Sequence, residues 1–135
     1  MNVKPYLHEV RYYETDKMGV THHSNYIRIM EEARIDWMDQ LGYGFERMEA
    51  EGIVSPVVAI SCNYKRTTTF KDLIEIEVKV GEMSELKISF TYTMKVDGKL
   101  VCTATSTHCF LDAGRPVVLK DRFPQLYAAI LENLE

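Results

Sequence analysis

The sequence has little cysteine, and its three thiols, Cys62, Cys102 and Cys109, form no CxxC motif and no pair with zinc-ligand spacing. An odd number of thiols without a framework predicts reduced cysteines in a cytoplasmic protein. No apolar run approaches the roughly 18 residues that suggest a membrane span. The first ten residues, MNVKPYLHEV, are too polar for a signal peptide. We therefore expect a cytoplasmic protein without a membrane segment.

Positive charge is also scarce. The formal net charge is −4 and there is no basic arm, which argues against nucleic acid as the main partner. Repeats, low-complexity tracts and linkers are absent, so residues 1–135 are expected to form a single domain. Hydrophobic residues make up 46% of the chain, enough for a core. A domain of this size leaves little room for an enclosed pocket, so we expect a sizeable ligand to bind between subunits.

The first half of the chain contains one strong helical pattern. Residues 6–14, YLHEVRYYE, alternate as a strand does. From Ser24 to Leu41 the apolar residues recur at helical spacing and form one stripe: Tyr26, Ile29, Met30, Ala33, Trp37 and Leu41. Gly42 and Gly44 supply the stop. The segment FERMEAEG predicts a second, brief helix that ends at Gly52.

The second half is β-rich. Four runs alternate and are rich in β-branched and aromatic residues: VVAISCNYKRTT, LIEIEVKVGEM, LKISFTYTMKV and KLVCTATSTHCFL. Asp97-Gly98 predicts a hairpin and Ser84-Glu85 another turn, while Pro124 opens a C-terminal helix. We expect an α+β domain in which a curved antiparallel meander wraps around the long helix. Its open edges invite pairing into a homodimer or homotetramer.

The segment YYETDKMGVTHHSNY, residues 12–26, carries more polar groups than a turn needs. Asp16 has two interpretations. Its carboxylate either bonds to nearby backbone N–H groups in an Asx-turn, or acts as a nucleophile or as the base for a water. Gly19 likewise marks either a plain turn or a close approach of another group.

The helix that follows begins beside these residues. Its first N–H groups have no intrahelical partner and carry partial positive charge, so they can stabilise a developing oxyanion. His22 and His23 are adjacent, and adjacent side chains rarely point at one ion, so we expect no metal. A histidine that positions a substrate or moves a proton fits better. His108 is expected to be a satisfied sheet residue. We expect one of Glu31 and Glu32 on the solvated face; the other is either solvated too, which we favour, or borders a pocket.

The run ETDKMGVTHHSNY, followed by IRIMEEAR, resembles the 4-hydroxybenzoyl-CoA thioesterase family of hotdog-fold acyl-CoA thioesterases. The similarity is greatest to the bacterial branch with the motif D-x-x-G-V-x-x-H-x-N-Y, which is matched by Asp16, Gly19, Val20, His23, Asn25 and Tyr26. The resemblance implies a hotdog fold over nearly the whole chain, with the helix from about residue 24 at its centre.

By position, the resemblance implies that Asp16 is the catalytic aspartate and that the His23 backbone N–H polarises the thioester carbonyl. The His23 side chain matches the histidine typical of this branch, and Asn25 and Tyr26 match residues that shape the turn and the pocket. His22 stands where the family commonly has an aromatic or aliphatic residue, so its role is open. Lys17 and Met18 stand where the family often has small residues before the glycine, so the width of the acyl pocket is open.

The implied reaction is hydrolysis of an acyl-CoA or acyl-carrier-protein thioester, with no cofactor besides the CoA of the substrate. Lys65 and Arg66 either face the phosphates of CoA or are ordinary surface charge. The substrate-binding candidates are Gly19, His22, Asn25, Tyr26, Lys65 and Arg66, and the catalytic ones are Asp16 and His23. The alternatives are a hotdog dehydratase acting on a hydroxyacyl thioester and a non-catalytic acyl-CoA sensor, which would not need Asp16.

Overall fold

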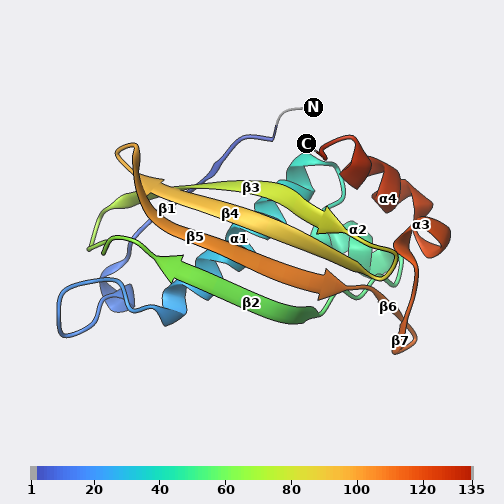
Figure 1. Cartoon of the computed structure of the whole chain (residues 1–135), viewed down its shortest axis with the longest axis horizontal. Helices are drawn as coiled ribbons and strands as arrows, with labels where there is room; N and C mark the ends of the chain where they lie inside the picture. Colours follow the sequence, from blue (N-terminus) through green and yellow to red (C-terminus); the bar gives the residue numbers. More distant parts are fainter. Residues whose placement is uncertain (1–2, 135) are drawn as a thin grey trace.

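The computed structural model describes residues 3–134, and Figure 1 shows their arrangement. The first half contains β1 (Tyr6–Glu9), the 3-10 turn η1 (Tyr12–Glu14), α1 (Ser24–Gln40) and α2 (Phe45–Ala50). The second half contains β2 (Val57–Tyr64), β3 (Leu73–Met83), β4 (Lys87–Val96), β5 (Lys99–Cys109), β6 (Leu111–Asp112), β7 (Arg115–Pro116), α3 (Leu119–Arg122) and α4 (Pro124–Leu131).

Five strands form one antiparallel sheet in the order β1-β3-β4-β5-β2. The sheet curves across α1, which runs along its concave face, and α3 and α4 cover one end (Figure 1). The expectation of an α+β domain with a curved antiparallel sheet around a long helix is confirmed. No helix among the described residues combines the length and the apolar run that a membrane crossing requires.

Burial of one helix face explains where α1 lies. The predicted stripe is buried at Tyr26, Ile29, Met30, Ala33 and Trp37, each no more than 3% exposed. It packs on the inner face of the sheet, where the rings of Trp37 and Phe90 are 5.3 Å apart. The helix ends as predicted, because Gly42 has a φ of +80°, a conformation that glycine adopts without strain.

Most of the predicted strands and turns are also confirmed. Asp97 and Gly98 have φ values of +50° and +76°, as a tight hairpin between β4 and β5 requires. The Ser84 N–H donates to the Lys87 carbonyl at 2.8 Å and turns β3 into β4. The brief second helix and the C-terminal helix at Pro124 are both present.

Three predictions about the β elements were wrong. The strand expected over residues 6–14 ends at Glu9, because the chain turns into η1, where the Glu14 carboxylate accepts a hydrogen bond from the Arg11 N–H. The strands do not form a simple meander, since β2 pairs with β5 and not with β3. The run that begins at Val57 stops being a strand after Tyr64. The short elements β6, β7 and α3 were not foreseen.

Strand β2 is an edge of the sheet, and no strand within residues 3–134 pairs with its outer side. Its apolar side chains are unusually exposed, with 49% of Val58, 37% of Ile60 and 49% of Tyr64 accessible. A long edge strand with apolar side chains is a surface on which another strand can pair.

Candidate active site

A tight loop joins η1 to α1 and carries Asp16 at its base. Thr15 and Thr21 form an isolated antiparallel bridge, and the Asp16 N–H donates to the Val20 carbonyl at 2.9 Å. Gly19 has a φ of +78°, and an added Cβ would meet no atom within 4 Å. The glycine is therefore needed for the backbone conformation of the turn, and no other group among residues 3–134 closely approaches the position that a Cβ would take.

The Asp16 carboxylate closes an Asx-turn. Its Oδ1 atom accepts a hydrogen bond from the Met18 N–H at 2.8 Å, and the residue is half-buried. Among residues 3–134 the second carboxylate oxygen has no hydrogen-bond donor. One oxygen thus orients the side chain, which leaves the other available as a nucleophile or a base.

The N-terminus of α1 lies beside this carboxylate. Three successive contacts tie the two sides of the loop together. They join Asp16 to Val20, Thr15 to Thr21, and the Glu14 carbonyl to the His22 N–H. The next N–H belongs to His23, and no group among the described residues accepts a hydrogen bond from it. An unpaired N–H at the positive end of a 17-residue helix can bind a developing oxyanion.

The two histidine side chains lie together on the surface. Their ring centroids are 4.2 Å apart, and the Tyr64 ring stands 6.4 Å from His23 at a steep angle. The Tyr64 hydroxyl donates to the His23 carbonyl at 3.4 Å. His22 uses Nδ1 to contact both the Ser24 hydroxyl, at 2.9 Å, and the Ser24 N–H, at 3.2 Å. His22 therefore helps to begin the helix, while the His23 ring has no hydrogen-bond partner among residues 3–134.

Asn25 and Tyr26 face inward and hold the loop. The Asn25 amide donates to the Glu14 carbonyl at 2.9 Å, and the Tyr26 hydroxyl shares a 2.9 Å hydrogen bond with Thr68. Burial raises the pKa of Tyr26, so its hydroxyl keeps its proton at neutral pH. Both residues shape the turn, as their match to the family motif implies. Their contact with a substrate stays a prediction.

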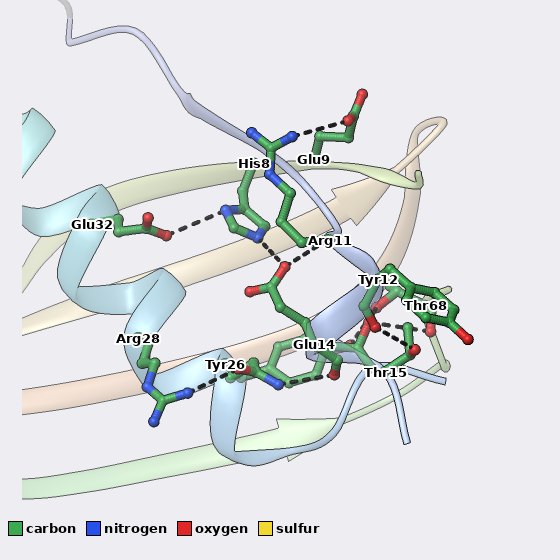
Figure 2. A network of polar contacts seen from close by, with 12 residues as sticks. His8, Glu9, Arg11, Tyr12, Glu14, Thr15, Tyr26, Arg28, Glu32 and Thr68 are labelled. Carbon is green, nitrogen blue, oxygen red and sulfur yellow. Dashed lines mark hydrogen bonds and ion pairs between the residues drawn. The ribbon is translucent and has the colours of Figure 1, made fainter. Parts of the chain in front are cut away.

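A cluster of His8, Glu14 and Glu32 that the sequence did not reveal supports the same loop, with His8 and Glu14 buried and Glu32 at the surface (Figure 2). His8 on β1 contacts the Glu14 carboxylate through Nε2 at 2.9 Å and the Glu32 carboxylate through Nδ1 at 3.2 Å. Each ring nitrogen of His8 therefore has a carboxylate oxygen within hydrogen-bonding distance. The cluster links β1, the loop and α1. Only the three-dimensional fold brings His8 and Glu32 together, since 24 positions separate them in the sequence.

Thr68 and Thr69, in the segment after β2, form hydrogen bonds with the other side of the loop. Thr21 makes three contacts with Thr68: its N–H donates to the Thr68 carbonyl at 2.8 Å, its hydroxyl approaches the same carbonyl at 3.2 Å, and the two hydroxyls are 2.6 Å apart. The Thr69 hydroxyl donates to the Gly19 carbonyl at 2.8 Å. No motif pointed to these threonines, because their role depends on a contact across 47 to 50 residues.

Lys65 and Arg66 directly follow Tyr64, so they lie at the end of β2 that adjoins His23. Both are exposed, and their N–H groups donate to the Val101 carbonyl. Within residues 3–134 no carboxylate lies within 4 Å of either side chain. Two unpaired cations therefore stand next to the N-terminus of α1.

The other sequence expectations have mixed outcomes. His108 is buried in β5 and hydrogen-bonded to Ser106, as expected. Of the two helix glutamates, Glu32 binds His8, while Glu31 borders a cavity that α1 shares with the sheet. Across the described part of the chain, no group of three or more His, Cys, Asp or Glu residues is arranged to hold a metal ion.

Comparison with known proteins identifies the family. Residues 10–134 match the model of the Thioesterase-like superfamily. A solved structure described as a DHNA-CoA thioesterase from Staphylococcus aureus superposes with a TM-score of 0.89 at 32% identity, over 96% of this chain and 89% of that one. The Escherichia coli (strain K12) long-chain acyl-CoA thioesterase FadM is 28% identical over 106 residues, which are 77% of this chain and 80% of FadM.

A third relative matches more of the chain than FadM does. YneP of Bacillus subtilis (strain 168), provisionally named an acyl-CoA thioesterase, is 32% identical over 124 residues, which are 90% of each protein. These neighbours confirm the expected hotdog fold.

Proposed function

The chain belongs to the thioesterase-like superfamily, and from that premise we propose that it hydrolyses an acyl-CoA or acyl-carrier-protein thioester to the free acid and the thiol. Within the superfamily we place it in the 4-hydroxybenzoyl-CoA thioesterase branch, as a single hotdog domain over residues 1–135. Relatives named as acyl-CoA thioesterases support the reaction. The observation that carries the proposal is the pairing of a carboxylate with an unpaired helix N–H on one loop.

In the proposed reaction the thioester carbonyl oxygen accepts a hydrogen bond from the His23 N–H. The helix dipole and this N–H stabilise the negative charge that develops on the oxygen. The His23 side chain borders the same position and orients the thioester or the water.

Asp16 has two routes to product. As a nucleophile, its free oxygen attacks the carbonyl carbon, the C–S bond breaks, the thiolate leaves, and water then cleaves the resulting anhydride. As a base, Asp16 takes a proton from a water whose oxygen attacks the carbonyl carbon, and the C–S bond breaks in the same way. A thiolate leaves readily, so neither route needs a strong general acid or a cofactor.

Lys65 and Arg66 are placed to bind the phosphates of CoA. They are unpaired, exposed and next to Tyr64, whose hydroxyl contacts the His23 carbonyl. A phosphopantetheine arm on a carrier protein offers a phosphate of the same chemistry, so both donors remain within the proposal. Three free cysteines fit a reducing compartment, and we place the protein in the cytoplasm.

The exposed edge of β2 supports a homodimer, the unit from which a tetramer would also be built. Antiparallel pairing of two β2 strands would bury the exposed Val58, Ile60 and Tyr64 side chains. A two-fold axis at the middle of the strand sets Tyr64 opposite the partner's Val57, about 5 Å away. The N-terminus of α1 in one protomer would then face the other end of β2 in its partner, and the substrate would bind between them.

A thiol-release assay on a panel of acyl-CoAs tests the proposal with wild type, Asp16→Asn and Asp121→Asn. Asp121 is an exposed aspartate on α3, remote from the loop, and serves as the matched control. We expect turnover by wild type and the control and loss of about 10²- to 10⁴-fold in Asp16→Asn.

Two other results would favour the alternative functions. Binding of acyl-CoA without turnover by the wild type would favour the sensor. Hydration or dehydration of a hydroxyacyl thioester without thiol release would favour the dehydratase.

A further inference from the structure

A cavity lies under the far end of α1, away from Asp16. Its volume is about 100 Å³, and it opens between α1, α2, β4 and α4. Its walls are mainly apolar and include Ile35, Met38, Phe90, Phe110 and Ile130, with Arg34 as the cationic member. Glu31 also lines the cavity, and an apolar cavity with a few polar or charged groups is the usual form of a small-molecule site.

Arg34 is held by a chain of buried polar groups that crosses the inner face of the sheet. The Arg34 guanidinium donates to the Tyr92 hydroxyl at 3.1 Å, and that hydroxyl lies 2.6 Å from the Ser106 hydroxyl. Ser106 lies 2.8 Å from His108 Nε2. Tyr92, Ser106 and His108 are each no more than 1% exposed. Buried polar chains of this kind fix the geometry of their members when every partner is satisfied.

The direction of the hydrogen bonds along the chain follows from the charge on His108. Burial lowers the pKa of His108 to about 4, with a contribution from the nearby Arg34 cation, so the ring is neutral at pH 7. The His108 ring also bonds to the Ser55 backbone, which leaves Nε2 as the acceptor. The Ser106 hydroxyl therefore donates to His108, and the Tyr92 hydroxyl donates to Ser106. The Tyr92 oxygen then accepts from Arg34, and every member is satisfied.

Several N–H groups of Arg34 are available for further hydrogen bonds. A guanidinium has five N–H groups, and within residues 3–134 only the contact to Tyr92 uses them. Glu31 borders the same cavity, yet no carboxylate among residues 3–134 lies within 4 Å of the Arg34 guanidinium. A half-buried cation beside apolar walls, without a counter-ion, is poised to bind an oxygen acceptor.

We propose that this cavity receives the far end of the acyl group and that Arg34 binds an oxygen acceptor on it, either a hydroxyl or a carboxylate. This rests on the proposed thioesterase function. The volume favours only the small terminal part of a short chain or of a ring, because the cavity, at about 100 Å³, is smaller than an apolar protein cavity of about 150 Å³ that holds benzene. A long unsubstituted chain has neither the room nor the acceptor.

The cavity serves the active site of the partner subunit. Arg34 lies eleven residues along α1 from His23, which is roughly 16 Å at 1.5 Å per residue and too far for a short acyl group in the same chain. Ser55, just before β2, lines the cavity, whereas Tyr64 at the other end of β2 contacts His23. Antiparallel pairing of two β2 strands brings these opposite ends together across the two-fold axis.

The test is the preference of the enzyme within matched pairs of substrates. The pairs are benzoyl-CoA with 4-hydroxybenzoyl-CoA, and pentanoyl-CoA with glutaryl-CoA. The variants are Arg34→Met, Tyr92→Phe and the control Arg47→Met, an exposed arginine on α2 that does not line the cavity. The readout is the ratio of kcat/KM for the oxygen-bearing member to that for the plain member, in proteins whose circular dichroism matches wild type.

We expect the wild-type ratio to be about 10- to 100-fold in at least one pair, which is the range for a hydrogen bond to a charged group. Arg34→Met should bring that ratio near one, Tyr92→Phe should lower it because Arg34 loses its support, and Arg47→Met should leave it unchanged. The pair that responds identifies a hydroxyl or a carboxylate. Ratios near one in the wild type, or a preference that survives in Arg34→Met, overturn the proposal while thiol release still supports the thioesterase.

Mixing the variants tests the contribution of the partner. Dimers formed by Asp16→Asn with Arg34→Met contain one intact site, with Asp16 from one chain and Arg34 from the other. Random re-pairing makes about a quarter of the sites intact, so activity on the oxygen-bearing substrate should rise above that of either variant alone. No rise after verified exchange of subunits would show that both residues act within one chain.

Discussion

Substitution of Glu14 tests how strongly the loop of the candidate active site depends on the contacts that this side chain makes. Only 7% of the Glu14 side chain is exposed, and its Oε1 atom accepts hydrogen bonds from the Arg11 N–H at 2.7 Å and from His8 at 2.9 Å. Glu14→Ala removes both acceptor contacts. It leaves the His8 ring, 10% exposed, with one carboxylate in place of two.

The magnitude follows from the two hydrogen bonds that the Glu14 side chain accepts. A hydrogen bond to a charged group is worth about 1.5 to 3 kcal/mol. We take the lower end for each bond, about 3 kcal/mol together, because Glu32 still contacts His8. With an unfolding entropy of about 2.1 cal/mol/K per residue, 1 kcal/mol shifts the Tm of a chain of this length by about 3.5 °C. Glu14→Ala should therefore lower the Tm by about 10 °C.

The assay is thermal unfolding followed by circular dichroism, with Glu9→Ala as the control. The Glu9 side chain is 51% exposed and lies 3.4 Å from Arg11, so its loss should cost no more than about 1 kcal/mol. Because the Glu14 carbonyl also holds the His22 N–H and the Asn25 amide, the folded variant should lose thioesterase activity as the loop shifts. A Tm within 3 °C of wild type, or a drop equal to that of Glu9→Ala, would refute the reasoning.

Three further predictions concern other parts of the molecule. Burial lowers the pKa of His108 to about 4 from its usual 6.5. The unfolded chain therefore binds a proton that the folded chain excludes, so the free energy of unfolding measured in urea should fall by about 2 kcal/mol from pH 7.5 to pH 5. The same pH dependence of this free energy in His108→Gln as in wild type would contradict this prediction. Burial raises the pKa of Cys102 to about 12, so native protein should be alkylated at half-buried Cys62 well before Cys102, as mass spectrometry of the labelled peptides would show. Ile60→Lys places a charge in the exposed edge of β2 and should shift sedimentation from dimer toward monomer, whereas Lys99→Ala on β5 should not.

Local patterns predicted the helices and most strands because those elements depend on residues close together in the sequence. The apolar stripe from Tyr26 to Trp37 determined which face of α1 is buried. The Asp97-Gly98 pair determined a hairpin because few residues adopt positive φ values there. Strand order was harder, since nothing in β2 itself indicates that it pairs with β5.

The site was predictable only in part. The motif located Asp16, Gly19 and His23 on one loop, but it did not show that Gly19 serves the turn geometry. The supporting groups escaped notice because they are distant in sequence: His8 meets Glu32, and Thr68 meets Thr21. The chain from Arg34 to His108 was missed for the same reason, since it joins a helix to the two central strands.

The central claim is that Asp16 carries out the chemical step. The most direct measurement is a single turnover with enzyme in excess of acyl-CoA, in which binding is saturated and the first release of thiol reports chemistry alone. The account predicts that Asp16→Asn binds the acyl-CoA as wild type does, while its first turnover is slower by about 10²-fold or more. A first turnover at the wild-type rate in Asp16→Asn would contradict the account.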